Sequence, residues 1–124
     1  MSGSAAAPRW VLLLQSGEAA RLAEAAAMAA TAVSLGTDVT LVWLSGAMEA
    51  LMSGRLEAEA GDPGSAGHLF AEARETGRVR FLACSAAMVK SRTPPERLRE
   101  KVDEIVGWPT VVSLVRASEQ SFVW

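Results

Sequence analysis

The sequence is poor in the residues that build metal centres and disulfide frameworks. It holds one cysteine and one histidine among 124 residues. A single cysteine cannot form an internal disulfide, and one cysteine with one histidine cannot supply a structural zinc site. We therefore expect no metal site, and the sequence implies no cofactor.

The chain also lacks a strong charge of one sign and a long apolar run. Its 12 basic and 14 acidic residues give a formal net charge of -2, so no global basic field attracts nucleic acid or an anionic membrane. The longest apolar run near the N-terminus covers residues 10–14. That run is too short for a signal peptide and for a membrane span of ~20 residues. With the free thiol, these absences predict a cytoplasmic protein with no nucleic-acid or membrane partner.

The sequence does contain enough apolar material to build one domain. Half of its residues are hydrophobic and its mean hydropathy is +0.20, which excludes a disordered chain. The length is typical of a single domain. Residues 1–8 are interpreted as a flexible leader, and the domain is expected to cover residues 9–124.

Three short runs of apolar and β-branched residues have the pattern of strands buried on both faces. They are residues 10–15 (WVLLLQ), 38–44 (DVTLVWL) and 79–84 (VRFLAC). Segments with helical spacing of apolar residues separate them, at residues 19–35, 47–53 and 66–76. A stretch rich in Gly and Ser, residues 57–67, is predicted to be a mobile surface loop.

The prolines and glycines beyond Cys84 indicate where the remaining elements begin and end. Pro94 and Pro95 favour a helix that begins after Thr93 as N-cap. The apolar spacing alone continues that helix to Val106. A break at residues 107–109 precedes a last helix at 109–118 and a closing strand at 121–124.

Strands that alternate with helices indicate a parallel sheet covered on both faces, because parallel neighbours need crossover connections. The predicted fold is a single three-layer α/β/α sandwich, flavodoxin-like in appearance, with a mostly parallel sheet of about five strands. Right-handed crossovers bring the carboxyl ends of the strands to one edge, where open α/β sheets bind ligands. The small polar residues that follow three strands are therefore expected to form one pocket: Ser16, Gly17, Ser45, Gly46, Cys84 and Ser85.

Cys84 is the candidate catalytic residue of this pocket. A cysteine between a strand and a helix start faces free backbone N–H groups and the positive end of the helix dipole, which favour the nucleophilic thiolate. The basic residues between Lys90 and Lys101 would favour it further if they folded over this edge. The alternative is that Cys84 is a small core residue, since free cysteines are among the most buried residue types.

Other residues offer weaker functional alternatives. Ser16 and Ser45 also suit helix capping, and no Ser/His/Asp arrangement activates either hydroxyl. His68 is a proton partner only if it lies near Cys84, and the competing interpretation is a surface or capping residue. Neither GxGxxG nor GxxxxGK[ST] follows a strand, so no phosphate-binding loop is indicated.

The order of these pieces resembles the DsrE/DsrF-like family, which includes sulfur-relay proteins of the TusD type. The matching pieces are WVLLLQSGE, SLGTDVTLVWLSGAM, GRVRFLACSAAM and the tail VDEIVGWPTVVSLVRASEQSFVW. The resemblance implies a five-stranded parallel sheet and a small homo-oligomer, often a trimer or hexamer. It also implies that the cysteine after the third strand, here Cys84, carries a persulfide between donor and acceptor proteins. Finally, it reassigns residues 102–106 from helix to a short strand.

The sequence departs from the family pattern in two places. Many relatives have a glycine shortly after the cysteine, where this chain reads SAAMVK, and no second cysteine exists to resolve a persulfide. Two functions therefore stay open. One is a sulfur carrier or sulfurtransferase that acts through Cys84. The other is a non-catalytic oligomeric binding or assembly module in which Cys84 only packs; nucleotide binding on a flavodoxin-like sheet is a third, weaker option.

Overall fold

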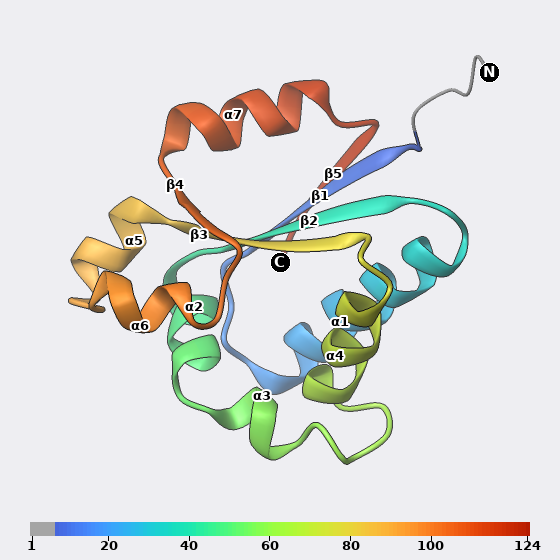
Figure 1. Ribbon diagram of the computed structural model, residues 1–124, viewed down its shortest axis with the longest axis horizontal. Coiled ribbons are helices and arrows are strands. Elements are labelled where there is room, and N and C mark those ends of the chain that lie inside the picture. Colours follow the sequence, from blue (N-terminus) through green and yellow to red (C-terminus); the bar gives the residue numbers. More distant parts are fainter. Residues whose placement is uncertain (1–6) are drawn as a thin grey trace.

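One sheet of five parallel strands organises the fold, in the order β4-β3-β2-β1-β5 (Figure 1). The computed structural model describes residues 7–124, so most of the predicted leader, residues 1–8, lies outside the described residues. The predicted parallel sheet is confirmed, and every neighbouring pair in it is parallel. Its strands are β1 (Arg9–Leu14), β2 (Asp38–Trp43), β3 (Val79–Cys84), β4 (Glu104–Val106) and β5 (Gln120–Val123).

Helices cover both faces of the sheet, which confirms the three-layer α/β/α architecture. The helix α7 (Trp108–Ala117) lies alone on one face (Figure 1). No helix among residues 7–124 has both the length and the apolar content needed to cross a bilayer. The opposite layer holds α1 (Ala19–Ser34), α2 (Ser45–Met52), α3 (Arg55–Ala58), α4 (Ala66–Glu75) and α6 (Pro95–Arg99), while α5 (Ser85–Lys90) continues directly from β3.

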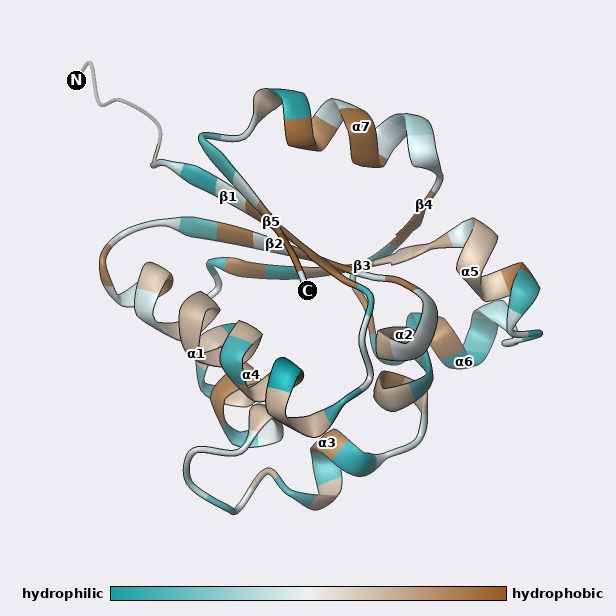
Figure 2. Cartoon of the chain, turned by 180° about the vertical axis from the view of Figure 1, so that it is seen from behind, coloured by the Kyte–Doolittle hydropathy of each residue, from teal (hydrophilic) through white to brown (hydrophobic). Residues whose placement is uncertain are grey.

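The sheet divides the core into two clusters because successive strand residues point to opposite faces. The larger cluster lies under α1 and α4 and contains an aromatic trio, Trp43, Phe70 and Phe81, with ring centroids 5.1–5.6 Å apart. The smaller one lies under α7. Hydrophobic residues are accordingly concentrated in the central strands (Figure 2). Burying each large apolar side chain stabilises the fold by roughly 1.5–3 kcal/mol.

The helix that periodicity predicts up to Val106 is wrong beyond Arg99. The helix α6 ends at Arg99, and Glu104–Val106 form β4, so the strand implied by the family resemblance is confirmed over three residues. Its pairing with β3 begins at Asp103, whose N–H donates to the Phe81 carbonyl (2.8 Å) and whose carboxylate accepts from the Phe81 N–H (2.7 Å). Tertiary pairing therefore overrides the local spacing.

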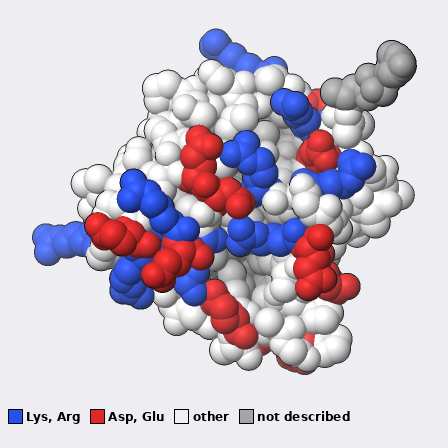
Figure 3. Space-filling model, in the orientation of Figure 1, with Lys and Arg blue, Asp and Glu red and all other residues white. Residues whose placement is uncertain are grey.

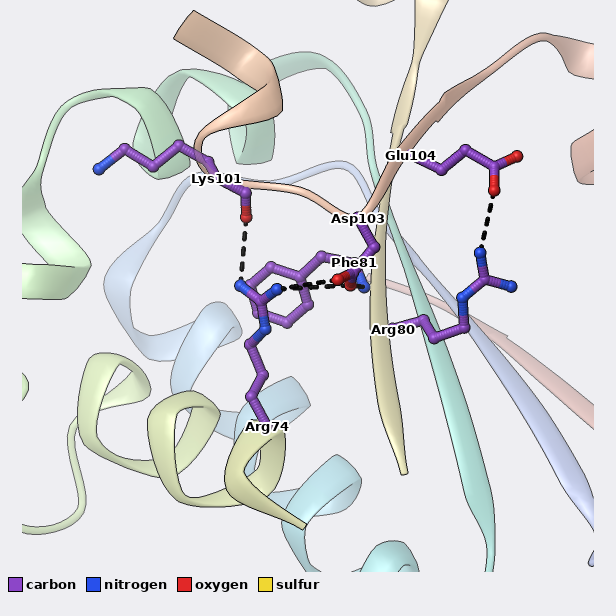
Figure 4. A network of polar contacts seen from close by, with 6 residues as sticks. All are labelled: Arg74, Arg80, Phe81, Lys101, Asp103 and Glu104. Atoms are coloured by element: carbon purple, nitrogen blue, oxygen red, sulfur yellow. Dashed lines mark hydrogen bonds and ion pairs between the residues drawn. The ribbon is translucent and has the colours of Figure 1, made fainter. Parts of the chain in front are cut away.

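Arg74 of α4 reinforces this junction from the helical layer (Figure 4). Its guanidinium donates to the Lys101 carbonyl (3.2 Å) and to Asp103 (3.3 Å), and it lies 4.2 Å from the centroid of the Phe81 ring. A cation over an aromatic face and a hydrogen-bonded ion pair both favour this geometry. Arg74 thus joins α4 to the chain that leads into β4.

Charges of both signs protect the short β4 edge. Arg80 of β3 and Glu104 of β4 form an ion pair at 3.0 Å beside this edge. Acidic and basic side chains are interspersed over the face shown in Figure 3. Charged side chains on a short edge strand disfavour pairing with another sheet.

The remaining boundaries differ from the predictions by a few residues. The helix α2 begins two residues earlier, at Ser45, and the N-cap of α6 is Pro94 in place of Thr93. The predicted loop 57–67 overlaps α3 and the start of α4. Its turns are hydrogen-bonded, since the Ser65 hydroxyl donates to the Glu59 carbonyl at 2.7 Å.

Candidate functional site

A cavity of about 560 Å³ lies at the carboxyl edge of the sheet, where the topology predicts a site. We call it the strand-end cavity. It is bordered by the ends of β1, β2 and β3 together with α2, α5 and the start of α7. Its lining residues are Gln15, Leu44, Ser45, Gly46, Glu49, Cys84, Ala86, Ala87, Lys90, Ser91 and Trp108.

The structure brings three of the six predicted site residues into this lining, namely Ser45, Gly46 and Cys84. Ser16 does not line the cavity; its hydroxyl accepts from the Glu18 N–H at 3.1 Å, which is a local turn-forming role. Ser85 is the first residue of α5 and also lies outside the lining. Residues that follow different strands therefore meet at this edge as expected, but fewer of them line the cavity than the sequence predicts.

Gly17 lies outside the lining but contacts Gly46, which is part of it. A Cβ on Gly17 would overlap the carbonyl oxygen of Gly46, so the turns after β1 and β2 meet backbone to backbone. The Ala47 N–H also donates to the Gln15 carbonyl at 3.1 Å. Gly17 and Gly46 have no Cβ, and this allows the two backbones to approach closely.

Ser45 begins α2 with an unusual backbone. Its φ of +42° lies in the left-handed region, which residues other than glycine rarely occupy. The residue is exposed and lines the strand-end cavity. Strained backbones of this kind are enriched at functional sites.

Cys84 ends β3 and borders the strand-end cavity, but the residue is only 1% exposed. The thiol belongs to the smaller core cluster, with Leu44, Val106 and Val111 among its members. Ala87 of α5 packs against the same cluster. Cys84 therefore combines the predicted position with the burial that the alternative interpretation requires.

The basic residues that follow Cys84 are divided among three cavities. Lys90 lines the strand-end cavity, whereas Arg92 and Arg97 line an adjoining hollow of about 320 Å³. Lys101 lies elsewhere, 2.6 Å from Glu57 at a separate cavity of about 180 Å³. Burial raises the pKa of Glu57, but the hydrogen bond and charge of Lys101, with a backbone hydrogen bond, outweigh it and lower the pKa.

His68 is not part of the strand-end cavity. Its Nδ1 lies 2.9 Å from the Ala60 carbonyl oxygen, and its Nε2 lies 2.8 Å from the Glu72 carboxylate. Both contacts hold the ring beside α3 and α4. The structure therefore gives His68 a structural role and does not bring it to Cys84.

Sequence reasoning missed Trp108 as a lining residue. Trp108 is the second residue after β4, so it lies at the same carboxyl edge as Cys84. Because the apolar spacing predicts a helix up to Val106, it gave no reason to expect a strand end just before Trp108. The strand implied by the family resemblance, taken with the rule about strand ends, was the signal that would have found it.

Comparisons with known proteins do not extend these observations. No protein-family model matches the chain, and no curated protein matches it significantly.

Proposed function

We propose that this chain is a DsrE-like sulfur carrier that takes up sulfane sulfur on Cys84 and passes it to a partner thiol. The observation that carries the proposal is the position of Cys84, at the end of a central strand and on the wall of the strand-end cavity. The five parallel strands support it as well. So does β4, which the family resemblance implied and periodicity did not.

The chemistry is a pair of displacements at sulfur. The Cys84 thiolate attacks the outer sulfur of a donor R–S–SH, giving Cys84–S–SH and R–S⁻. An acceptor thiolate then attacks that outer sulfur, giving the acceptor persulfide and restoring the Cys84 thiolate. Lys90 lines the same cavity and supplies positive charge for the anionic sulfur species.

Transfer requires that the shielded thiol become reachable, and α5 is the element whose movement would expose it. This helix has six residues, none of which is buried, although Ala87 packs against the cluster that contains Cys84. Elements with few buried contacts open at low free-energy cost. A small displacement of α5 therefore opens the wall between the thiol and the strand-end cavity.

A second candidate function is a non-catalytic binding or assembly module in which Cys84 only packs. The observation that favours it is the 1% exposure of Cys84 within an apolar cluster. In that case the strand-end cavity binds its ligand without covalent chemistry. A cavity of this size at the carboxyl edge of an α/β sheet is suitable for either function.

The proposal includes assembly into a homo-oligomer, as a trimer or hexamer. Support comes from large apolar side chains left exposed on α7 and β5, Val112 (45%) and Val123 (62%), which a contact between subunits would cover. Sedimentation equilibrium of the full chain tests this part, and a monomer at all concentrations would contradict it.

Sulfur loading tests the main proposal. The native protein is incubated with glutathione persulfide, freed of the reagent and examined by intact mass for one added sulfur atom. We expect the wild-type protein to gain it and Cys84→Ser to remain unmodified while keeping its circular dichroism spectrum. Sulfur loading of Cys84→Ser, or no loading of the wild-type protein, would contradict the sulfur carrier. The binding or assembly module would then be the remaining candidate function.

A further inference from the structure

The end of α5 differs from the ends of the other helices that close with a left-handed residue. The chain turns after α1, α2 and α4 at Gly36, Gly54 and Gly77, with φ between +75° and +91°. After α5 the same position holds Arg92, at φ +57°. Glycine is the usual residue there because a side chain destabilises the left-handed conformation.

The hydrogen bonds at the end of α5 are those of an ordinary Schellman turn. The Thr93 N–H donates to the Met88 carbonyl (3.0 Å), and the Arg92 N–H donates to the Val89 carbonyl (3.1 Å). The turn after α1 repeats this pattern with Gly36 in the position of Arg92. Nothing in the turn itself therefore requires an arginine, and the side chain is retained at a conformational cost.

Arg92 lines the hollow of about 320 Å³ together with Arg97. Glu49 and Ser91 line both this hollow and the strand-end cavity, so the two adjoin each other. We call the combined feature the trench. Its lining contains three basic residues, Lys90, Arg92 and Arg97, and one tryptophan, Trp108.

Basic side chains outnumber acidic ones in the trench lining. Lys90, Arg92 and Arg97 form no ion pair in the described part of the chain, whereas Arg74, Arg78, Arg80 and Lys101 do. Glu49 is the one acidic residue in the lining. The strand-end part of the lining also holds apolar residues, among them Leu44, Ala87 and Trp108. The trench thus offers both basic and apolar side chains to a ligand.

We propose that the trench binds an acidic segment of a partner protein. Carboxylates of the segment pair with Arg92 and Arg97, and an apolar residue of the segment lies against Trp108. An open trench lined by both basic and apolar side chains suits an extended peptide, because a small ligand is normally enclosed on most sides. The inference rests on the proposed function in one respect: it names the kind of partner that reaches the cavity beside Cys84.

A labelled peptide tests this proposal by fluorescence anisotropy. The probe is a fluorescein-labelled Glu-Glu-Glu-Gly-Leu-Leu peptide, and the same peptide with Gln for Glu is its control. We expect the Glu peptide to bind at least ~5-fold more tightly at low salt, which corresponds to one charge-assisted contact. Its advantage should fall as salt is added.

Arg92→Gly separates binding from folding. We expect this variant to bind the Glu peptide at least ~5-fold more weakly while its Tm stays equal to or above that of the wild type. Arg92→Gln should lose the same affinity. Arg116→Gln is the matched control, since it removes one positive charge from an exposed position eight residues beyond Trp108 on α7. Its affinity should stay within ~2-fold of the wild type after the same charge change.

Several outcomes would overturn the proposal. These are equal affinity for the Glu and Gln peptides, no binding of either, equal losses in Arg92→Gly and Arg116→Gln, or a lowered Tm in Arg92→Gly. Sulfur loading and peptide binding are measured on the same preparation of the wild-type protein. Failed sulfur loading with intact peptide binding therefore contradicts only the sulfur carrier, and the reverse result contradicts only the peptide site.

Discussion

Gly17 and Gly46 meet backbone to backbone at the carboxyl edge of the sheet, where a Cβ on the first would overlap the carbonyl oxygen of the second. This contact fixes the turn after β1 against the turn after β2. Because Gly46 lines the strand-end cavity, the same contact sets the shape of one cavity wall. The two glycines thus link the stability of the fold to the geometry of the site.

Gly17→Ala is expected to destabilise the protein by ~1–3 kcal/mol, because overpacking a tight backbone contact forces the two turns apart. The measurement is urea unfolding followed by circular dichroism. Gly61→Ala is the control, since a Cβ there meets nothing within 4 Å. Equal stability of Gly17→Ala and the wild type would refute the close contact.

Asp103→Ala is expected to cost ~1–3 kcal/mol, because it leaves the Phe81 N–H without its side-chain acceptor and removes the partner of Arg74. Glu104→Gln should cost less than ~1 kcal/mol, because its pair with Arg80 is exposed. Chemical denaturation of both variants checks the order. A larger loss in Glu104→Gln would mean that Asp103 does not anchor β4.

Glu57 predicts a pH dependence of stability with a defined sign. Its folded-state pKa is lowered below the ordinary 4.5, with the contacts to Lys101 outweighing burial. The contribution is therefore present above pH 4.5 and is lost as the pH falls through the lower folded pKa. Glu57→Gln should be less stable by under ~1 kcal/mol at neutral pH, as expected for a mostly exposed pair.

That difference should vanish in acid, where the carboxylate of the wild type is protonated. The measurement is the free energy of unfolding of the two proteins between neutral and strongly acidic pH. Glu75→Gln, at an exposed residue of α4 outside the ion pairs of the described residues, should track the wild type throughout. A gap between wild type and Glu57→Gln that widens in acid would reverse the predicted sign.

The central strands could be predicted from sequence because they are buried on both faces and read as continuous apolar runs. The strand β4 could not be predicted from periodicity, because it has only three residues and follows a helix with the same apolar spacing. Its identity depends on Asp103 and Arg74, whose partners lie more than twenty residues away along the chain. Such long-range contacts leave no local pattern.

The candidate site could be placed by topology but its lining could not be completed. Strand ends predicted Ser45, Gly46 and Cys84 correctly as lining residues. Trp108 was not predicted, because its position depends on β4, which the periodicity did not indicate. Lys90 is one of several basic residues after Cys84, and the sequence does not show which of them lines the cavity. The burial of Cys84 depends on Val106 of β4 and Val111 of α7 as well as on Ala87 of α5, and the sequence does not show how these elements pack.

Lys90→Gln is expected to slow sulfur loading from glutathione persulfide several-fold at low salt, because Lys90 is the one basic residue in the lining of the strand-end cavity. The difference should shrink as ionic strength rises. Arg116→Gln, with the same change in net charge, should load at the wild-type rate. Identical slowing in both variants would assign the effect to net charge and remove Lys90 from the site.

The accessibility of the Cys84 thiol in the native state tests the central claim most directly. Iodoacetamide labelling of Cys84 is followed by intact mass at increasing urea concentrations below the unfolding transition. Opening of α5 predicts labelling at zero urea, at a rate nearly independent of urea, because the movement is local and exposes little surface. Labelling that occurs only in proportion to global unfolding would contradict the account and make Cys84 a core residue.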